Sequence, residues 1–432
     1  MGVSRRTFLR RSAGAAATGI LGRVHAGQRA SLKAKVLVVG GGFAGSACAL
    51  MLRHLLPALD VTLVDPDDRY VTCPMSNAVL VGWRDFDSIT VSRQGLGRGG
   101  VTYVQDRVVA IETGPRRARL GGGAALAYDR LVVAPGIRMR WGMPEGYDEA
   151  AALIMPHAWQ AGPQTLILAA QLRAIRDGGV VAISVPAGPM RCPPGPFERA
   201  SLIAGFLRAH KPRAKVLIFD ANNHFPRQDT FSEAWRVLYP GMIEWIPVTE
   251  DGAVVRVAPA EMTLYTAHAA HRIDVANIIP PQAPGLLALQ AGLASDHGWC
   301  PINPQTFESS SVGGVHVIGD ACIADPMPKS ASAASAQARQ CALAIAASLE
   351  GREVPAPHFD SVCYSLLEPR SALSIHGRFR VAQGLIQQLQ GAQLQGAEDS
   401  QPATAAQEAL NADDWYRRIV RDSFGRVTVA DS

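Results

Sequence analysis

Three of the seven cysteines, Cys73, Cys192 and Cys363, stand in turn-like sequence and not on an apolar helical face. Cys192 is flanked by prolines, and a carboxylate, Glu198, follows six residues later. A thiol held in this way can pair with a second cysteine as a redox disulfide, be attacked by a thiolate or hydrosulfide, and form a persulfide. With Cys363 as the partner, the residues alone leave three interpretations open: a redox pair, a structural disulfide or two unrelated thiols.

Glu198 and Cys73 each allow two interpretations. Glu198 begins a predicted helix, where it could cap the N-terminus or take and return protons while a persulfide forms. Cys73 lies in Tyr70-Val-Thr-Cys-Pro-Met-Ser-Asn77, and is either an ordinary loop cysteine or the attachment point of a prosthetic group. Cys48 and Cys341 lie in Ala-rich helical stretches and are interpreted as small core residues. Cys300 and Cys322 stand in ambiguous sequence, for which a core position is the favoured interpretation.

A glycine-rich turn near the start of the chain predicts the scaffold for this chemistry. The apolar strand 36–39 runs into Gly40-x-Gly42-x-x-Gly45 and then into an Ala-rich helix. Gly40 makes the tight turn, Gly42 lets the backbone approach a pyrophosphate, and Gly45 allows close packing of helix on strand. Asp65 ends the next strand, twenty residues on, where an acid binds a ribose 2′-hydroxyl. The alternative is a glycine turn without a ligand.

A late strand, Val315-His-Val-Ile-Gly-Asp320, returns to the same unit and indicates that the dinucleotide is FAD. Asp320 is expected to bond the ribityl chain, the alternative being a helix N-cap. The helix that begins near 330 would point its N-terminus at the flavin pyrimidine and stabilise negative charge there. Lys329 would reinforce that field, or else be a solvated lysine. The predicted cofactor contacts are Gly40, Gly42, Phe43, Ala44, Gly45, Asp65, Cys73, Ala134, Gly136, Gly319, Asp320 and Lys329.

The loop after the strand 180–185 argues against a second nucleotide. In a nicotinamide-dependent reductase a second Gly-x-Gly-x-x-Gly would follow this strand, but here the chain reads Pro186-Ala-Gly-Pro-Met-Arg-Cys-Pro-Pro-Gly-Pro-Phe-Glu198. Prolines remove backbone N–H groups and stiffen the turn, so this loop cannot offer the same amide cradle to a pyrophosphate. The Cys192 thiol stands in its place. Cys73, in turn, is expected near the dimethylbenzene edge of the flavin, where a thiolate could form a thioether to the 8α-methyl group.

The N-terminal sequence predicts export. Ser4-Arg-Arg-Thr-Phe-Leu-Arg10 precedes a mild apolar run and a small-residue cleavage site, so residues 1–26 are interpreted as a twin-arginine signal peptide. The alternative is a basic arm. The formal charge of +5 falls to near neutral without the five leader arginines, which implies neither nucleic acid nor an anionic membrane surface as partner. No later run is long and apolar enough to span a bilayer, and no metal site is predicted.

The order of elements predicts an α/β fold with two Rossmann-like, doubly wound domains and a small α+β C-terminal domain. The expected boundaries are 34–150 with 290–353 for a split FAD domain, 151–289 for a second dinucleotide-fold-like domain, and 354–432 for the C-terminal domain. Within that last domain, 387–407 is expected to be a loose connector and 413–422 a short helix. The strand around 373–381 should have one buried and one wet face.

These motifs together resemble the flavoprotein subunit of flavocytochrome c sulfide dehydrogenase, a family related to sulfide:quinone oxidoreductases. The resemblance runs from about Lys35 to Gly425. Beside the glycine turn, it is carried by Thr72-Cys-x-x-Ser-Asn77, Cys192-Pro-Pro-Gly-Pro-x-Glu198, Gly298-Trp-Cys-Pro301, Thr306-Phe-Glu-Ser309, Val317-Ile-Gly-Asp320, Pro326-Met-Pro-Lys-Ser330, Cys363-Tyr-Ser365 and Trp415-Tyr416.

The resemblance implies roles that the residues alone leave open. Cys73 would carry FAD through an 8α-S-cysteinyl bond, Cys192 and Cys363 would form the redox disulfide, and Glu198 would be the acid-base residue. Electrons from sulfide or polysulfide would pass through FAD to a separate periplasmic c-type cytochrome, because this chain has no Cys-x-x-Cys-His haem motif. The alternatives are an accessory flavoprotein of a thiosulfate-oxidising system and a sulfide:quinone reductase.

Overall fold

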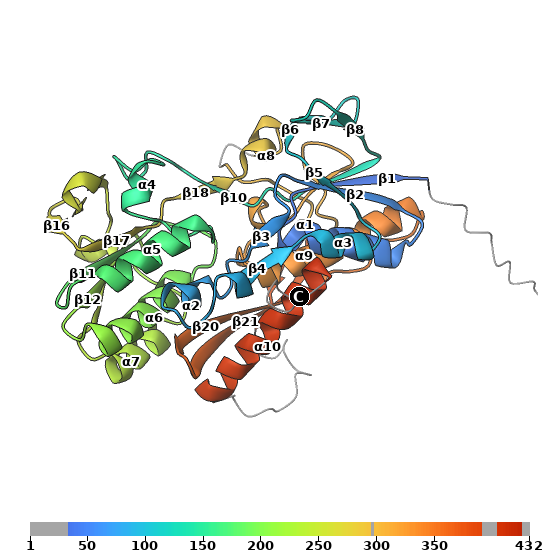
Figure 1. Cartoon of the computed structure of the whole chain (residues 1–432). Coiled ribbons are helices and arrows are strands. Elements are labelled where there is room, and N and C mark those ends of the chain that lie inside the picture. Colours follow the sequence, from blue (N-terminus) through green and yellow to red (C-terminus); the bar gives the residue numbers. More distant parts are fainter. Residues whose placement is uncertain (1–32, 295–297, 391–403, 426–432) are drawn as a thin grey trace, which may run out of the picture. The chain divides into compact units, whose positions relative to one another are not determined.

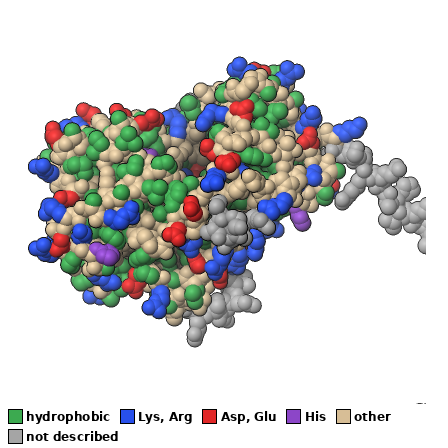
Figure 2. Space-filling view, in the orientation of Figure 1, with side chains coloured by type: hydrophobic (Ala, Val, Ile, Leu, Met, Phe, Trp, Pro, Cys, Tyr) green, Lys and Arg blue, Asp and Glu red, His purple; other side chains and the backbone are tan. Residues whose placement is uncertain are grey.

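A computed structural model describes residues 33–294, 298–390 and 404–425 (Figure 1). The twin-arginine segment, 1–26, lies outside the described residues, as does most of the expected connector, 391–403. Among the described helices, none combines the length and apolar character needed to cross a membrane. The face in Figure 2 mixes acidic and basic side chains, with Lys and Arg gathered where α10 (Ala405–Phe424) lies.

The first parallel sheet is assembled from distant parts of the chain. Its strand order is β19-β9-β1-β2-β5, and every neighbouring pair is parallel. The strands are β1 (Lys35–Val39), β2 (Asp60–Asp65), β5 (Thr102–Gln105), β9 (Arg130–Val133) and β19 (Val315–Val317). Valine and leucine runs form these strands because helices cover a parallel sheet and bury its apolar side chains. The late strand β19 thus stands beside β9, on the far side of β9 from β1.

Two helices that pack on each other support the glycine turn. α1 (Phe43–Leu55) and α9 (Ala331–Leu349) contact one another extensively. Alanine-rich sequence favours both helices, and small buried residues such as Ala49, Cys48 and Cys341 allow close approach. Ser330 caps α9, because its hydroxyl accepts a hydrogen bond from the Ala333 N–H at 3.2 Å. Asp320 is therefore not that helix cap.

The second parallel sheet has the order β13-β12-β11-β17. It consists of β11 (Val180–Val185), β12 (Lys215–Asp220), β13 (Ile243–Ile246) and β17 (Val275–Ile278). The helix α5 (Pro163–Ala174) precedes the first of these strands, and α6 (Gly195–His210) and α7 (Gln228–Leu238) lie in the connections. The predicted strand 180–185 is confirmed at its stated bounds. Apolar side chains from this sheet and its helices, including Ile183, Phe197 and Phe231, form a hydrophobic core.

The C-terminal unit is an antiparallel sheet with a helix against it. β20 (His358–Glu368), β21 (Ser371–Ala382) and β22 (Leu385–Gln388) pair in sequence order, and α10 packs on β21. The predicted strand with a buried and a wet face is confirmed as β21, in which Leu373 and Phe379 are buried while His376 and Arg378 are exposed. The predicted fold class is confirmed by these three units.

The expected helix 413–422 is wrong in length, because α10 begins eight residues earlier. Its first turns contain Ala, Gln, Glu and Leu, which are strong helix formers. Thr404 caps it by accepting a hydrogen bond from the Gln407 N–H at 3.2 Å. The high content of Gln and Ala, interpreted as a sign of loose structure, is equally typical of an exposed helical face.

The remaining elements form small sheets, short helices and turns that connect the three units. The strands are β3 (Arg69–Val71), β4 (Thr90–Ser92), β6 (Val108–Glu112), β7 (Arg117–Leu120), β8 (Ala125–Ala127), β10 (Ile137–Met139), β14 (Arg256–Ala258), β15 (Thr263–Tyr265), β16 (Ala270–Arg272) and β18 (Gln282–Pro284). The helices are α2 (Ser76–Leu80), α3 (Gln94–Arg98), α4 (Ala151–Ile154), α8 (Leu286–Gln290) and the 3₁₀ turns η1 (Asp87–Ile89), η2 (Val248–Glu250), η3 (Pro259–Glu261) and η4 (Gly319–Ala321).

Candidate active site

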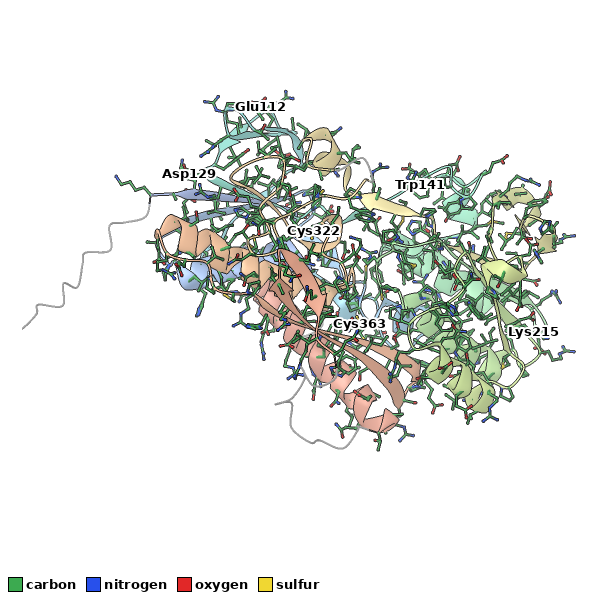
Figure 3. The ribbon with its side chains drawn as sticks, turned by 180° about the vertical axis from the view of Figure 1, so that it is seen from behind. Glu112, Asp129, Trp141, Lys215, Cys322 and Cys363 are labelled. Atoms are coloured by element: carbon green, nitrogen blue, oxygen red, sulfur yellow. The ribbon has the colours of Figure 1, made fainter. Side chains whose placement is uncertain are left out.

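One pocket joins the glycine turn to the three turn cysteines. Its empty space is about 1220 Å³, open mouth included, which suits a large ligand because ligand pockets are typically about 300 to 1,000 Å³. Cys363 stands on β20 near the centre of the view in Figure 3, where the C-terminal strands meet the rest of the chain. The predicted site residues that line the pocket are Gly42, Phe43, Ala44, Cys73, Ala134, Gly136, Cys192, Glu198, Gly319, Asp320 and Cys363.

The glycine turn fits a dinucleotide pyrophosphate. Gly40 has φ of +100°, and a Cβ there would collide with the carbonyl oxygen of Ala134. A Cβ on Gly45 would collide with the carbonyl oxygen of Gly40. Both glycines therefore shape the turn, although neither of them lines the pocket. Gly42 is different, because a Cβ there would meet only Tyr70 at 3.6 Å. No side chain caps α1 at Gly42, so its leading N–H groups remain available to an anion.

Asp65 ends β2 beside this turn without lining the pocket. Its Oδ2 accepts a hydrogen bond from the Gly41 N–H at 2.7 Å, and its Oδ1 pairs with the Arg93 guanidinium at 3.1 Å. Arg93 is buried and also donates from Nε to the Gly41 carbonyl oxygen at 3.0 Å. Asp65 thus anchors the glycine turn, while its role toward a ribose stays a prediction.

Asp320 lines the pocket, whereas Lys329 lies outside it. The Asp320 carboxylate lines the pocket and pairs with Arg191 at 3.9 Å. Burial raises its pKa, and the charges of Arg191 and Lys329 oppose that shift. Lys329, by contrast, does not line this pocket, and its role toward the flavin stays a prediction. Its ammonium donates to the carbonyl oxygens of Asp320 and Cys322, each at 2.9 Å, and lies 3.9 Å from the centre of the Trp299 ring.

The Cys192 loop is held in an unusual backbone conformation. Cys192 has φ of +53°, which costs a residue with a Cβ roughly 1–3 kcal/mol. Two hydrogen bonds of 2.8 Å hold it there, from the Cys192 N–H to the Lys329 carbonyl and from the Gly195 N–H to the Cys192 carbonyl. A Cβ on Gly195 would lie 2.8 Å from the Trp159 ring and 3.0 Å from the Cys192 sulfur. Glycine at 195 therefore makes room for the thiol.

Glu198 links three elements around the thiols. Its Oε1 accepts a hydrogen bond from the Leu366 N–H on β20 at 2.9 Å, and its Oε2 accepts one from the Asn77 side-chain amide on α2 at 2.7 Å. Burial raises the pKa of this carboxyl group, and the two hydrogen bonds and the charge of Arg199 oppose the rise. The carboxylate bonds distant segments instead of its own helix start, which disagrees with the capping interpretation.

A buried arginine next to Glu198 is a part of the site that the sequence reasoning missed. Arg199 donates to the side-chain oxygens of Asn77 at 2.9 Å and Asn277 at 2.8 Å. It also donates to the carbonyl oxygens of His157 at 3.1 Å and Ala158 at 2.7 Å. Burial lowers its pKa to about 10. The available signal was a charged residue inside the apolar helix 195–210, because a buried charge must find partners.

The cysteines fall into two groups, those that line the pocket and those that are buried in the hydrophobic core. Burial raises the pKa of Cys192, as do Cys363 and Glu198, whereas Arg191 opposes the rise. Burial also raises the pKa of Cys363, and a hydrogen bond with Ser330 opposes it. All seven cysteines are free thiols in this structure. The predictions of core positions are confirmed, because four of them are at most 1% exposed: Cys48, Cys300, Cys322 and Cys341.

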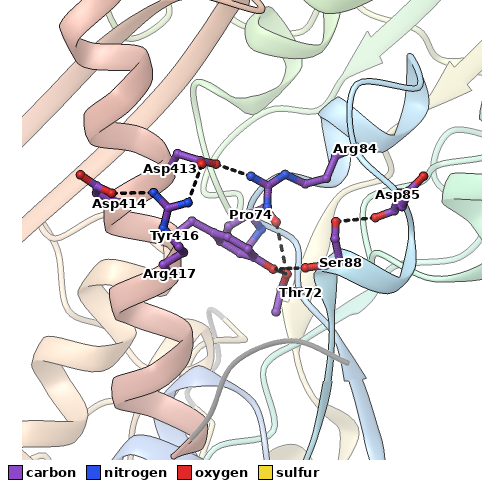
Figure 4. Close-up of polar contacts among 9 residues, drawn as sticks. All are labelled: Thr72, Pro74, Arg84, Asp85, Ser88, Asp413, Asp414, Tyr416 and Arg417. Atoms are coloured by element: carbon purple, nitrogen blue, oxygen red, sulfur yellow. Dashed lines mark hydrogen bonds and ion pairs between the residues drawn. The ribbon is translucent and has the colours of Figure 1, made fainter. Parts of the chain in front are cut away.

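The loop that carries Cys73 is attached to the C-terminal helix (Figure 4). The Tyr416 hydroxyl lies 2.8 Å from the Thr72 hydroxyl, in a buried hydrogen bond next to Cys73. Arg84 pairs with Asp413 and lies over the Tyr416 ring. The Cys73 thiol itself donates to the Trp159 carbonyl oxygen at 3.8 Å. A thiol held at the wall of the pocket fits an attachment point for a bound group.

A second pocket lies at the carboxyl ends of β11 and β12, where a doubly wound sheet usually binds its ligand. Asp220 lines it, fully buried, and accepts hydrogen bonds of 3.0 Å from the Trp245 indole and the Asn222 N–H. Five of the lining residues are prolines: Pro189, Pro193, Pro226, Pro326 and Pro328. Proline carries no N–H, so this wall lacks the donors of a pyrophosphate cradle.

Comparison with known proteins defines the class. Residues 34–156 match the pyridine nucleotide-disulphide oxidoreductase family. The solved structure of a sulfide:quinone oxidoreductase from Aquifex aeolicus superposes with a TM-score of 0.69 at 16% identity, over 91% of this chain and 93% of that one, which shows a common fold. Together with the glycine turn, these findings make the chain an FAD-dependent oxidoreductase of this fold.

Two further matches show the family. Residues 165–280 match the central part of the "Sulfide dehydrogenase [flavocytochrome c] flavoprotein chain", and residues 355–424 match "Flavocytochrome c sulphide dehydrogenase, flavin-binding". A sulfide dehydrogenase flavoprotein chain from Chlorobaculum thiosulfatiphilum is 58% identical over 45 residues, 10% of this chain and 94% of that sequence. The mitochondrial sulfide:quinone oxidoreductase of Mus musculus is 22% identical over 70% of this chain and 68% of its own length. The chain belongs to the flavocytochrome c sulfide dehydrogenase flavoprotein family, related to sulfide:quinone oxidoreductases.

Proposed function

We propose that this chain oxidises hydrosulfide in the periplasm and passes the electrons through FAD to a c-type cytochrome on a separate chain. The observation that carries the proposal is the composition of one pocket. It joins a dinucleotide-binding turn to Cys192, Cys363 and a buried carboxylate, Glu198. The family supports sulfide as the substrate, because both family matches outside the first domain are to sulfide dehydrogenase flavoproteins. Export by the twin-arginine pathway is inferred from residues 1–26.

The sulfur step is proposed to begin from a disulfide between Cys192 and Cys363. Hydrosulfide attacks one sulfur, the bond between the cysteines breaks, one cysteine becomes a persulfide and the other leaves as a thiolate. The electron pair comes from hydrosulfide, whose sulfur is oxidised to the sulfane level while the disulfide is reduced. Glu198 takes up the persulfide proton and later returns it. Both thiols line the pocket of Glu198, which supports this assignment.

The residues at the first sheet would hold the cofactor. The N–H groups that open α1 at Gly42 would bind the pyrophosphate, and Asp320 would bind the ribityl chain. FAD bound there supplies an acceptor for two electrons and a donor of single electrons to haem iron. A thioether from the Cys73 sulfur would keep the cofactor in the exported protein.

Covalent attachment at Cys73 predicts a mass change. The mature protein, denatured and analysed by mass spectrometry, should carry one FAD mass on the peptide that contains Cys73. In Cys73→Ala the covalent mass should disappear, because the proposed thioether bond to FAD is made by the Cys73 sulfur. Cys322→Ala serves as the control, since Cys322 is buried outside the flavin pocket. Full covalent retention in Cys73→Ala would refute the attachment site.

The direct test of the function is anaerobic mixing of the oxidised holoprotein with sulfide in a stopped-flow spectrophotometer. The absorbance of the oxidised flavin should fall after mixing with sulfide, and oxidised cytochrome c added afterwards should restore it. A flavin that stays oxidised at millimolar sulfide would refute sulfide oxidation. Restoration by a short-chain quinone but not by cytochrome c would refute the acceptor and favour a sulfide:quinone reductase.

A further inference from the structure

The proposed sulfur step places an anion in an unfavourable pocket. Hydrosulfide must lose its hydration to reach Cys192, and an unpaired buried charge is costly. Two carboxyl groups, Glu198 and Asp320, line the same pocket and would repel the anion when ionised. A cation with unused hydrogen-bond donors near Cys192 would offset both costs. Two arginines line the pocket and are the candidates, Arg191 and Arg199.

Arg199 has its donors committed to the protein. Its Nε and both terminal nitrogens donate to Asn77, Asn277 and two backbone carbonyls, at 2.7 to 3.1 Å. Its guanidinium also lies 5.1 Å from the centre of the Trp159 ring. Binding an anion would require this residue to give up contacts made in a fully buried position. Arg199 is therefore a structural cation that positions Asn77 and the chain at 157–158.

Arg191 is arranged differently. Its backbone N–H donates to the Gln282 side chain at 2.8 Å, which fixes the start of the Cys192 loop. One terminal nitrogen donates to the Trp159 carbonyl oxygen. The other faces Asp320 at 3.9 Å, an ion pair longer than a hydrogen bond. Within the described chain, its Nε–H and the donors of that second nitrogen have no hydrogen-bond partner.

The charge of Arg191 also acts on the thiols. It is the group that opposes the rise in the pKa of Cys192, a rise caused first by burial and then by Cys363 and Glu198. Arg191 is the neighbour of Cys192 in the chain, and its side chain is 14% exposed within the pocket. A guanidinium with unused donors that lines the same pocket as the thiol has the chemistry of a binding site for a small anion.

We propose that Arg191 binds the anionic nucleophile, a small monovalent sulfur anion, and directs it to the sulfur of Cys192. This inference rests on the proposed function and adds to it a substrate-binding residue and the choice of sulfur. Hydrosulfide bound to the guanidinium approaches Cys192, the bond to Cys363 breaks, and Cys363 leaves as the thiolate. The persulfide that forms on Cys192 stays beside the same positive charge.

Alkylation of the reduced holoprotein tests this binding without sulfide. Iodoacetate is an anion and iodoacetamide is its neutral analogue, and both alkylate the same thiolate. Peptide mass spectrometry gives the rate at Cys192 for each reagent. In Arg191→Gln the ratio of the iodoacetate rate to the iodoacetamide rate should fall roughly tenfold, because a positive cleft raises the local concentration of anions. Arg191→Lys should keep the ratio within about threefold of wild type, since the charge remains.

The neutral reagent reports the reactivity and access of the thiol, so its rate corrects for any shift in the pKa of Cys192. Arg213→Gln is the matched control, because this exposed arginine pairs with Asp177 away from the pocket. An unchanged ratio in Arg191→Gln would overturn the proposal. If that variant does not fold, thiocyanate should slow iodoacetate but not iodoacetamide at Cys192 of the wild type, and equal slowing would overturn it. Neither result depends on whether sulfide reduces the flavin.

Discussion

Cys363→Ala should abolish reduction of the flavin by sulfide. Without Cys363 there is no bond to Cys192 for hydrosulfide to break, so no persulfide can form by displacement. The loss of a group that is covalently involved typically costs several orders of magnitude, and we expect the bleaching rate to fall on the order of a thousandfold or more. Anaerobic stopped-flow absorbance of the variant and the wild type at equal sulfide measures the change.

The control for Cys363→Ala is Cys341→Ala, which removes the same atoms from the buried core of α9. That variant should reduce at the wild-type rate even though it loses some stability. Dithionite should bleach the flavin of both variants, which shows that the cofactor is bound and reducible. A Cys363→Ala protein that sulfide reduces as fast as the wild type would eliminate the disulfide mechanism.

The effect should be confined to chemistry because Cys363 sits on a well-supported strand. β20 pairs with β21 along nearly its whole length, with Cys363 opposite Ile375, and the same strand contacts α6 and α9. Three residues further on, the Leu366 N–H binds Glu198. The strand therefore sets the places of both the second thiol and one donor to the carboxylate, and removal of one sulfur atom leaves the backbone hydrogen bonds of the strand intact.

The parts of the site that sequence predicted well are those set by local geometry. The glycine turn is recognisable because Gly40 needs a positive φ and Gly45 needs contact with Gly40, and both requirements act within six residues. The strand at 180–185 is likewise fixed by its own apolar run. In contrast, Cys192 and Cys363 are 171 positions apart, and spacing carries no information about such a contact. The resemblance to a family supplied their common pocket.

The buried hydrogen-bond network of Arg199 could not be predicted from local sequence either, because its members are far apart in the chain. Arg199 binds oxygens on Asn77 and Asn277, which come from α2 and β17, and neither pattern predicts the other. The contacts of Lys329 are a second example. Its position before α9 led to the prediction that it reinforces the field at the flavin, but the sequence did not indicate that its ammonium donates to the carbonyl oxygens of Asp320 and Cys322 and lies over the Trp299 ring. Side-chain direction depends on partners that only the tertiary fold brings near.

Glu198→Gln should slow persulfide formation by about a hundredfold or more, the usual effect of losing a general acid or base. Glutamine keeps the size of the side chain but cannot take a proton. Burial raises the pKa of Glu198, so the wild type should lose this advantage as the pH falls below that raised value. The ratio of wild-type to variant rate should therefore approach one at low pH. Taking the ratio cancels the ionisation of sulfide itself.

Unfolding in urea at several pH values gives an independent measure of the same carboxyl group. A group whose pKa is raised in the folded protein stabilises the fold fully below its unfolded value of 4.5, and this stabilisation is lost as the pH rises through the folded pKa. Glu198→Gln should remove that pH-dependent loss, whatever constant cost arises from placing an amide against the Asn77 and Leu366 donors. Glu244→Gln, which alters an exposed carboxylate on β13 outside the pocket, should change neither profile. A rate ratio for Glu198→Gln that is independent of pH, together with an altered stability profile, would mean that Glu198 holds α6, α2 and β20 together without carrying the proton.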